Sequence, residues 1–251
     1  MITTITRPDT GRILLRGEPL NDSHPALIGY MPEERGLYKK MKVGDQLLYL
    51  GQLKGLSKAE AQKAVRSWFE KFGIMSWWDK KVEELSKGMQ QKAQFIATVL
   101  HNPPLLILDE PFSGLDPLNA NLIKDEIDAL HRNGTTIIFS THRMEQVEEI
   151  CDHIILIHQG KNILDGAVQD VRNRFKENLF HIGFAGSTAP QLGNLATVVT
   201  EKNQELVVHL SPDTPANAVL SCLIDQKIAI RSFHEILPTL NEIFIKQVGT
   251  V

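Results

Sequence analysis

The chain has 251 residues and a mass of 28.2 kDa, with 42% hydrophobic and 23% charged residues, as in one globular domain or a domain with a small appendage. Its formal net charge is -3, so no global positive field favours nucleic acid or acidic lipid as a partner. Cys151 and Cys222 have no CxxC spacing, which argues against a disulfide framework or a zinc site and fits a reducing cytosol.

The chain shows no sequence feature of a membrane-spanning or secreted protein. No run approaches the roughly 18 to 20 apolar residues that cross a bilayer. The first residues, MITTITRPDTGR, lack the long apolar stretch of a secretory signal peptide. We therefore expect a soluble chain that reaches a membrane only through a partner.

The N-terminal part of the chain predicts two short strands and a helical region. The strands are expected at Arg12–Leu15 and Leu27–Tyr30. From Val43 to about Asp79, apolar residues recur at three- and four-residue spacings, which is typical of amphipathic helices. We expect this segment, about 43–80, to form a helical subdomain.

Further along, short apolar runs alternate with helical segments. The runs are Leu105–Leu108, Thr135–Phe139 and Ile154–Ile157. Uninterrupted apolar strands that alternate with helices indicate a mainly parallel sheet covered on both faces. The predicted fold class is therefore α/β.

The helix between the first two runs has clear end signals. Asp116 is the expected N-cap, Pro117 fits the first helical position, and Gly134 follows the C-terminus.

After Gly166 the pattern becomes that of a small α+β unit. A polar helix, Gln169–Asn178, is typical of a linker. Strands are expected at Leu179–Phe184, Ala196–Thr200, Leu206–Leu210 and Ile228–Phe233, and helices at Pro215–Gln226 and Pro238–Val248. The sequence thus predicts a first domain at 1–166, a linker at 167–178 and a C-terminal accessory α+β domain at 179–251, which shows no catalytic cluster.

Two adjacent carboxylates follow the first apolar run, in the sequence LLILDE. Open α/β sheets place their ligands at the carboxyl ends of their strands, which is where Asp109 and Glu110 stand. In phosphoryl-transfer sites the first acid helps to hold Mg²⁺ and the second orients or deprotonates the attacking water. A strand that ends in two solvated acids is an equally good explanation of this motif alone.

The sequence LSKGM precedes a helix with a clear apolar face. Ser86 is the expected cap, and Gly88 lets backbone N–H groups approach a ligand closely. A helix N-terminus carries free donors and a partial positive charge, so it suits a phosphate. In isolation, an ordinary capped helix is the more common explanation.

A third motif, Ser140-Thr141-His142, follows the second apolar run. A histidine just beyond a strand end is able to reach a γ-phosphate at the same sheet edge. A lone histidine is more often structural, so this motif is weak by itself.

In combination, the order and spacing of the motifs resemble the ABC ATPase family. The signature sequence is LSKGM, the Walker B strand is LLILDE, the D-loop is Ser113–Asp116, and the switch histidine is His142. The resemblance covers Met1 to about Gly166. It implies a P-loop NTPase-like ABC cassette, with a mainly parallel sheet plus helical subdomain, that binds ATP and Mg²⁺.

The resemblance also implies a role for each candidate residue. Asp109 binds the metal ion, Glu110 is the catalytic base, and His142 senses the γ-phosphate. The residues expected to contact nucleotide or to act at the dimer contact are Ser86, Gly88, Met89, Glu33 and Asp116.

Three positions depart from the family pattern. Lys87 and Met89 replace a glycine and the glutamine of the usual LSGGQ signature. Glu33 stands where the Q-loop glutamine is expected; an acid is able to meet Mg²⁺ or water but cannot donate as an amide does. The variants LSKGMQQK and PEERGLY resemble a subgroup near the sodium-export ATPases, which carry a C-terminal accessory domain like residues 179–248 here.

The phosphate-loop motif GxxxxGK[ST] does not occur in the 251 residues. In the family this Walker A loop and its helix come immediately before a segment resembling ITTITRPDTGRILLRG. We therefore expect that Met1 falls inside that helix, that the chain is N-terminally truncated, and that it is inactive alone.

The resemblance implies a head-to-tail dimer, in which a second copy is the expected ATP-binding partner. This dimer would drive export through a separate integral-membrane subunit. The segment Val43–Asp79 is the expected docking surface for that subunit. Such a protein is cytoplasmic and peripheral on the inner face of the cell membrane. One alternative is a truncated, non-catalytic cassette that only contributes its signature motif to a partner's ATP site. A second, a soluble ABC ATPase of translation or DNA repair, fits less well because this chain has neither tandem cassettes nor long coiled-coil insertions.

Overall fold

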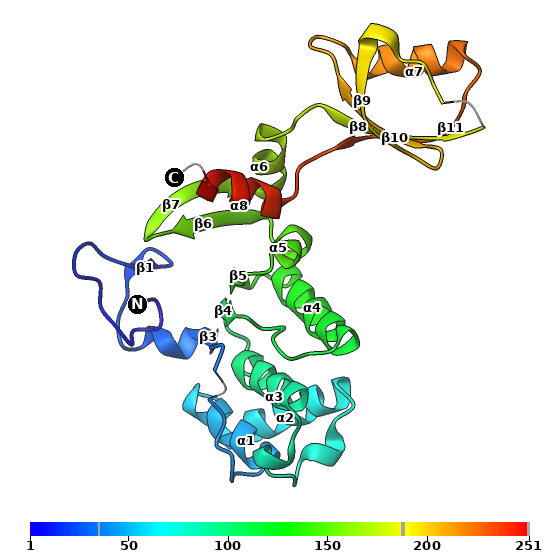
Figure 1. The fold of residues 1–251 in the computed structure, drawn as a ribbon. Helices are drawn as coiled ribbons and strands as arrows, with labels where there is room; N and C mark the ends of the chain where they lie inside the picture. Colours follow the sequence, from blue (N-terminus) through cyan, green and yellow to red (C-terminus); the bar gives the residue numbers. More distant parts are fainter. Residues whose placement is uncertain (35, 187–188, 250–251) are drawn as a thin grey trace. The chain divides into compact units, whose positions relative to one another are not determined.

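The computed structural model describes residues 1–34, 36–186 and 189–249. Arg35 of the PEERGLY segment, residues 187–188 and the last two residues of the predicted C-terminal domain lie outside this description. The chain divides into two compact units, Met1–His142 (unit 1) and Arg143–Val251 (unit 2). Figure 1 shows the elements of both units.

Unit 1 has a parallel sheet at its centre. Its elements in chain order are β1 (Leu14–Leu15), β2 (Glu18–Pro19), η1 (His24–Leu27), β3 (Ile28–Met31), α1 (Val43–Leu53), α2 (Lys58–Lys71), η2 (Met75–Trp77), η3 (Val82–Glu84), α3 (Lys87–Val99), β4 (Leu105–Asp109), α4 (Pro117–Arg132) and β5 (Thr136–Ser140). In the described residues, β4 pairs in parallel with β3 on one side and β5 on the other. The predicted α/β class and its central LLIL strand are confirmed.

The helices of unit 1 begin and end where local signals place them. Ser57 and Glu60 form a reciprocal capping box at the start of α2. The helices α1 and α2 and the short turn η2 occupy the segment that was predicted to be helical. The first predicted strand is shorter than expected: only Leu14–Leu15 pairs, in a two-residue hairpin with β2.

Aromatic side chains join α2 to α3, and a glycine lets α3 approach the sheet. The ring of Phe95 on α3 lies 6.2 Å from that of Trp68 and 6.4 Å from that of Phe72, both from the α2 region. A Cβ atom at Gly29 would stand 2.6 Å from the carbonyl oxygen of Thr98, so β3 approaches α3 as closely as it does only because residue 29 is glycine. This packing fixes α3 against the strands that carry the site.

A half-buried histidine makes the stability of unit 1 sensitive to acid. Burial and, to a smaller extent, the neighbouring Lys54 ammonium together lower the pKa of His101 to about 4. The unfolded chain therefore binds a proton more readily than the folded one, so stability is complete above about pH 6.5 and falls as the pH drops toward 4. The free energy of unfolding falls by less than about 3 kcal/mol over this range, because solvent screens the partly exposed ring.

We expect His101→Leu to reduce the pH dependence of unfolding in this range. Denaturant unfolding followed by tryptophan fluorescence measures it, because Trp68, Trp77 and Trp78, the three tryptophans of the chain, all lie in unit 1. The exposed His131 provides the matched control, His131→Leu. An unchanged pH dependence in His101→Leu would contradict the assignment.

Unit 2 contains a two-stranded hairpin and a separate four-stranded sheet. Its elements are α5 (Met144–Ile150), β6 (His153–His158), β7 (Lys161–Ala167), α6 (Val168–Arg174), β8 (Leu179–Ala185), η4 (Gly193–Leu195), β9 (Ala196–Lys202), β10 (Glu205–Leu210), α7 (Ala216–Asp225), β11 (Ala229–Ile236) and α8 (Leu240–Gly249). These lie close to the strands and helices predicted after residue 150.

The apolar run at Ile154–Ile157 forms a strand, but not the parallel strand that was predicted. In β6 it pairs antiparallel with β7. Gln159 and Gly160, with φ of 49° and 74°, connect the two strands as a tight turn of the type that hairpins favour. The side chains of Ile155 and Ile157 are exposed, so the strand alternates rather than being buried on both faces.

The four-stranded sheet is antiparallel, in the order β11-β8-β10-β9. The helix α7 packs on one face of it (Figure 1). The core between sheet and helix consists of Ile182, Phe184, Leu192, Ala196, Leu206, Val208, Leu210, Val219 and Leu223. Among the described residues this core contains no charged side chain.

The last helix packs outside this sheet. The backbone N–H of Leu240 donates to Glu148 Oε1 of α5 at 2.6 Å. Arg172 on α6 donates to the carbonyl oxygen of Pro238 at 3.0 Å and forms an ion pair with Glu148 at 3.4 Å. The helix α8 therefore contacts α5, which precedes the predicted linker, and α6, which lies within it, while the predicted boundaries at 166 and 179 stay a prediction.

Of the helices within the described ranges, none combines the length and apolar character that a transmembrane segment needs.

Candidate functional site

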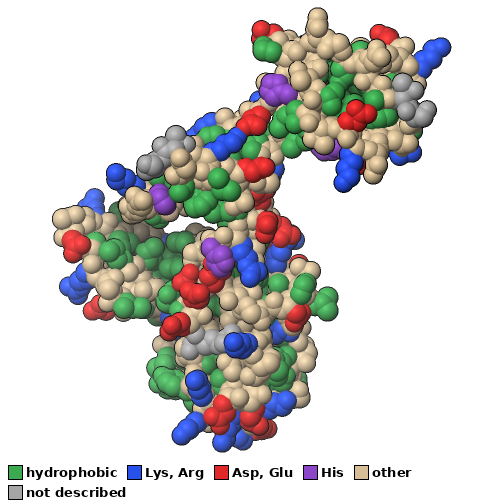
Figure 2. Space-filling view, viewed as in Figure 1, with side chains coloured by type: hydrophobic (Ala, Val, Ile, Leu, Met, Phe, Trp, Pro, Cys, Tyr) green, Lys and Arg blue, Asp and Glu red, His purple; other side chains and the backbone are tan. Residues whose placement is uncertain are grey.

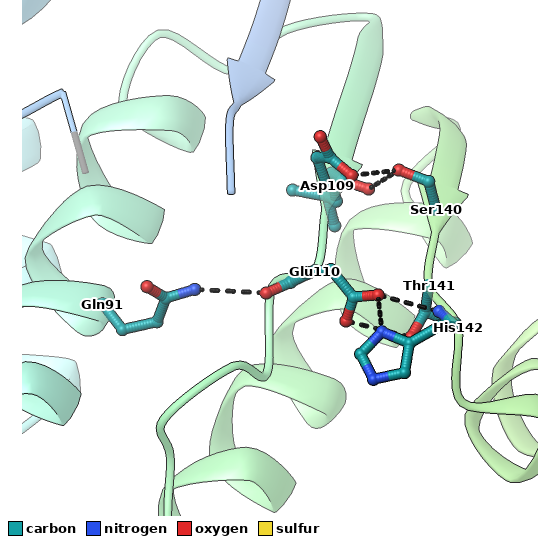
Figure 3. A network of polar contacts seen from close by, with 7 residues as sticks. Gln91, Asp109, Glu110, Ser140, Thr141 and His142 are labelled. Atoms are coloured by element: carbon teal, nitrogen blue, oxygen red, sulfur yellow. Dashed lines mark hydrogen bonds and ion pairs between the residues drawn. The ribbon is translucent and has the colours of Figure 1, made fainter. Parts of the chain in front are cut away.

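The carboxyl ends of β4 and β5 bring the first group of predicted residues together. Asp109 is the last residue of β4 and lies beside Ser140, the last residue of β5. The Ser140 hydroxyl is 2.7 Å from Asp109 Oδ1 and 3.3 Å from the carbonyl oxygen of Leu108. Asp109 is thus held at the sheet edge by the neighbouring strand (Figure 3).

Glu110 follows directly and is held by three donors. Its Oε1 accepts the backbone N–H of His142 at 2.8 Å, and its Oε2 accepts the Thr141 hydroxyl at 3.1 Å. The third contact joins Oε1 to His142 Nδ1 at 2.5 Å. Only 12% of the Glu110 side chain is exposed, so this carboxylate has a fixed direction (Figure 3).

His142 is anchored at one ring nitrogen and open at the other. Because a carboxylate only accepts, the Nδ1 atom that faces Glu110 carries the proton. The side chain is 78% exposed, and Nε2 lies on the side of the ring away from Glu110 (Figure 3). In the imidazolium form, Nδ1–H stays on Glu110 while Nε2–H is able to donate to an anion.

Glu33 lies at the same edge of the sheet but is not joined to this group. It follows β3, whose end is fixed because Gln94 Nε2 donates to the carbonyl oxygen of Pro32 at 2.8 Å. The Glu33 side chain is exposed. Within the described residues, no hydrogen bond or ion pair links it to Asp109 or Glu110.

The remaining predicted residues form a second group around the start of α3. The N-cap Ser86 accepts the backbone N–H of Met89 at 3.3 Å. Asp116, the N-cap of α4, accepts the backbone N–H of Asn119 at 3.0 Å. Hydrogen bonds from the backbone and side chain of Asn119 lower the pKa of Asp116, which keeps the carboxylate ionised.

A cavity of about 450 Å³ opens at this second group. Its lining consists of Trp77, Ser86, Lys87, Gly88, Met89, Lys92, Gly114, Asp116 and Asn119. Two lysines and the free N–H groups at the start of α3 give it the chemistry of an anion site.

Acidic side chains gather beside a histidine on one face of unit 1 (Figure 2). Mg²⁺ is usually held by one or two protein oxygens together with phosphate oxygens and water. No cluster of three or more His, Cys, Asp or Glu side chains suited to a metal exists among the described residues. Asp109, with Ser140 beside it, fits a Mg²⁺ ion that a phosphate chain also holds, and not a closed protein cage.

Sequence reasoning missed several residues of both groups. Gln91 on α3 is buried, and its Nε2 donates to the carbonyl oxygen of Pro111 at 3.0 Å and of Glu110 at 3.4 Å. Thr141 was part of the third motif but was given no role, and Lys92 adjoins the signature sequence. Position in or next to a motif was the only available signal for these residues.

A buried parallel strand ending in two carboxylates, a Ser-Thr-His sequence at the end of the next strand and a capped helix start beside them are features of a nucleotide-binding cassette of the P-loop type. The chain matches the family described as ABC transporter over residues 1–113, and that described as ATP-binding protein DrrA1-3-like, C-terminal domain, over residues 166–248.

Two curated relatives align over the whole chain. An uncharacterized ABC transporter ATP-binding protein of Alkalihalophilus pseudofirmus is 42% identical over 251 residues, which cover 100% of this chain and 94% of the relative. The uncharacterized ABC transporter ATP-binding protein YhaQ of Bacillus subtilis is 41% identical over 251 residues, covering 100% and 84%.

A solved structure described as the ATP binding subunit of an ABC transporter aligns with a TM-score of 0.64 and 30% identity, over 69% of this chain and 74% of that one. The chain belongs to the family of ABC transporter ATP-binding proteins. It is the ATP-binding subunit of a transporter and works with a membrane component. The alternative of a cassette that only lends its signature motif is not favoured by these relatives.

Proposed function

We propose that this subunit hydrolyses ATP in a head-to-tail pair of identical copies and couples hydrolysis to export through a separate integral-membrane subunit. The observation that carries the proposal is the pairing of Glu110 with His142 at the carboxyl edge of β4. A buried carboxylate with a fixed direction, beside an exposed imidazole, is suited to orient water next to a phosphate.

The roles follow from the contacts. Asp109 would hold Mg²⁺, which neutralises charge on the phosphates when bound. Three of the roughly four lone-pair sites on the Glu110 carboxylate are occupied, which leaves one, on Oε2, for the proton of a water molecule. Glu110 is therefore the proposed base. His142 is the proposed γ-phosphate sensor through its outward Nε2.

The cavity lining shares no residue with the group of Asp109, Glu110 and His142, which is consistent with two half-sites. In the proposed pair, each nucleotide lies between copies. Ser86, Gly88 and Met89 of one copy then meet the phosphates held at the other copy, with Asp116 at the contact.

The proposed docking surface for the membrane subunit lies in the helical segment Val43–Asp79. Tyr49 and Leu53 on α1 are exposed, at 43% and 61%. Exposed apolar side chains on a polar helix surface are typical of a protein interface. Docking there would place the subunit in the cytoplasm, peripheral on the inner face of the cell membrane.

Mixing two inactive variants tests the head-to-tail pair. Glu110→Gln damages one copy's own half of the site, whereas Ser86→Arg damages the half that it offers to its partner. In an equal mixture of the two variants with random pairing, half of the pairs are mixed, and each mixed pair keeps one intact site of two. ATP hydrolysis should recover to at most about a quarter of the parental rate. No recovery would mean that both groups act within one copy.

A further inference from the structure

The backbone of Glu110 adopts a conformation that its side chain disfavours. Its φ of 46° lies in the left-handed region, which is uncommon for a residue other than glycine, asparagine or aspartate. Such a conformation persists only where the surrounding contacts impose it. It also turns the chain at the end of β4, so that the carboxylate faces β5 and His142 (Figure 3).

Contacts on both sides of this residue impose the conformation. The Glu110 N–H donates to the carbonyl oxygen of Ser140 at 2.9 Å. On its carbonyl side, Glu110 accepts the N–H of Ser113 at 3.0 Å and the Gln91 amide at 3.4 Å. The same Gln91 amide donates to the carbonyl oxygen of Pro111 at 3.0 Å, so it holds two consecutive peptide groups.

Gln91 is the only one of these partners that acts through a side chain from a distant element. Its side chain comes from α3, and the residue is 1% exposed, so water cannot take the place of its amide. Nearby Thr98 on the same helix is also buried, but its hydroxyl donates at 2.8 Å to the carbonyl oxygen of Gln94, within its own helix. Of these two buried side chains, only that of Gln91 contacts the segment after β4, at the carbonyl oxygens of Glu110 and Pro111.

We propose that Gln91 is a positioning residue that holds Glu110 in its left-handed conformation and thereby directs the carboxylate onto His142. Because α3 also begins with Ser86, the helix that offers the signature sequence to a second copy fixes the base of its own copy. The effect on turnover rests on the proposed function, whereas the effect on the Glu110–His142 contact does not.

The test is the tautomer of His142, observed by NMR of the 251-residue chain with ¹⁵N-labelled imidazoles in alkaline buffer. The His142→Gln spectrum assigns the signal. In the parent, the contact with Glu110 should place the proton on Nδ1. Gln91→Met keeps length and apolar bulk but removes the donor, and should move the proton toward Nε2. The control Thr98→Val should leave the signal unchanged.

The second measurement is the steady-state kinetics of ATP hydrolysis. Gln91→Met should lower kcat about tenfold to hundredfold and leave KM for ATP within about twofold, because substrate contacts are untouched while the base is misdirected. If the parent hydrolyses no ATP, the proposed function fails, but the NMR result still decides the role of Gln91.

An unchanged His142 signal in folded Gln91→Met would overturn the proposal, and so would a His142 signal that does not respond to Glu110→Gln. Tryptophan fluorescence of unit 1 shows whether each variant folds. If Gln91→Met does not fold, Gln91→Asn replaces it, because it keeps the amide but reaches one carbon less. Gln91→Asn should shift the His142 signal in the same direction as Gln91→Met, but by a smaller amount. The absence of any shift would contradict the proposal.

Discussion

Replacement of Glu110 by glutamine should remove most of the ATP turnover of this protein and leave ATP binding intact. The amide keeps the size of the side chain and accepts at one atom, but it cannot take a proton from water. General-base contributions amount to roughly 10²- to 10⁴-fold, and we expect a loss in that range. Phosphate release and equilibrium binding of a fluorescent ATP analogue measure the two quantities.

The control for this variant is Glu201→Gln, the same chemical change at an exposed position on β9 in unit 2. It should leave turnover unchanged. If Glu110→Gln retains turnover within a few-fold of the parent, Glu110 is not the base, and its contact with His142 has another role.

Replacement of Ser86 by arginine should abolish ATP-dependent pairing of two copies. Ser86 is exposed at the N-terminus of α3 and lines the cavity with Lys87 and Gly88. An arginine there fills the space in which a partner's phosphates would lie. The lost cap should cost only about 1 kcal/mol, so the fold should survive. Light scattering with and without Mg²⁺ and ATP, in the Glu110→Gln background to prevent turnover, measures pairing.

The chain offers a matched control in Ser57, which caps α2 as Ser86 caps α3. Ser57→Arg loses the same kind of cap and adds the same charge, but it does not touch the cavity. It should pair normally. Equal pairing by both variants would show that the LSKGM sequence does not face a partner's nucleotide.

The local features of the site were predictable from the sequence. The caps at Ser86 and Asp116 each accept a hydrogen bond from a backbone group only three residues away. Contacts between residues this close in the sequence depend on backbone geometry that every helix start shares. The LLILDE strand, with its two acids at the carboxyl end, was placed correctly because an uninterrupted apolar run is also a local signal.

The sequence by itself determined which chemical groups exist and in what order they follow the strands. Only the tertiary structure decided which of them meet. Glu110 contacts His142 across 32 residues and Gln91 across 19, and β6 pairs antiparallel with β7 although its apolar run also suits a parallel sheet. The physical reason is that periodicity reports which face of an element is buried, whereas pairing direction and long-range side-chain contacts depend on packing against elements that the local pattern does not name.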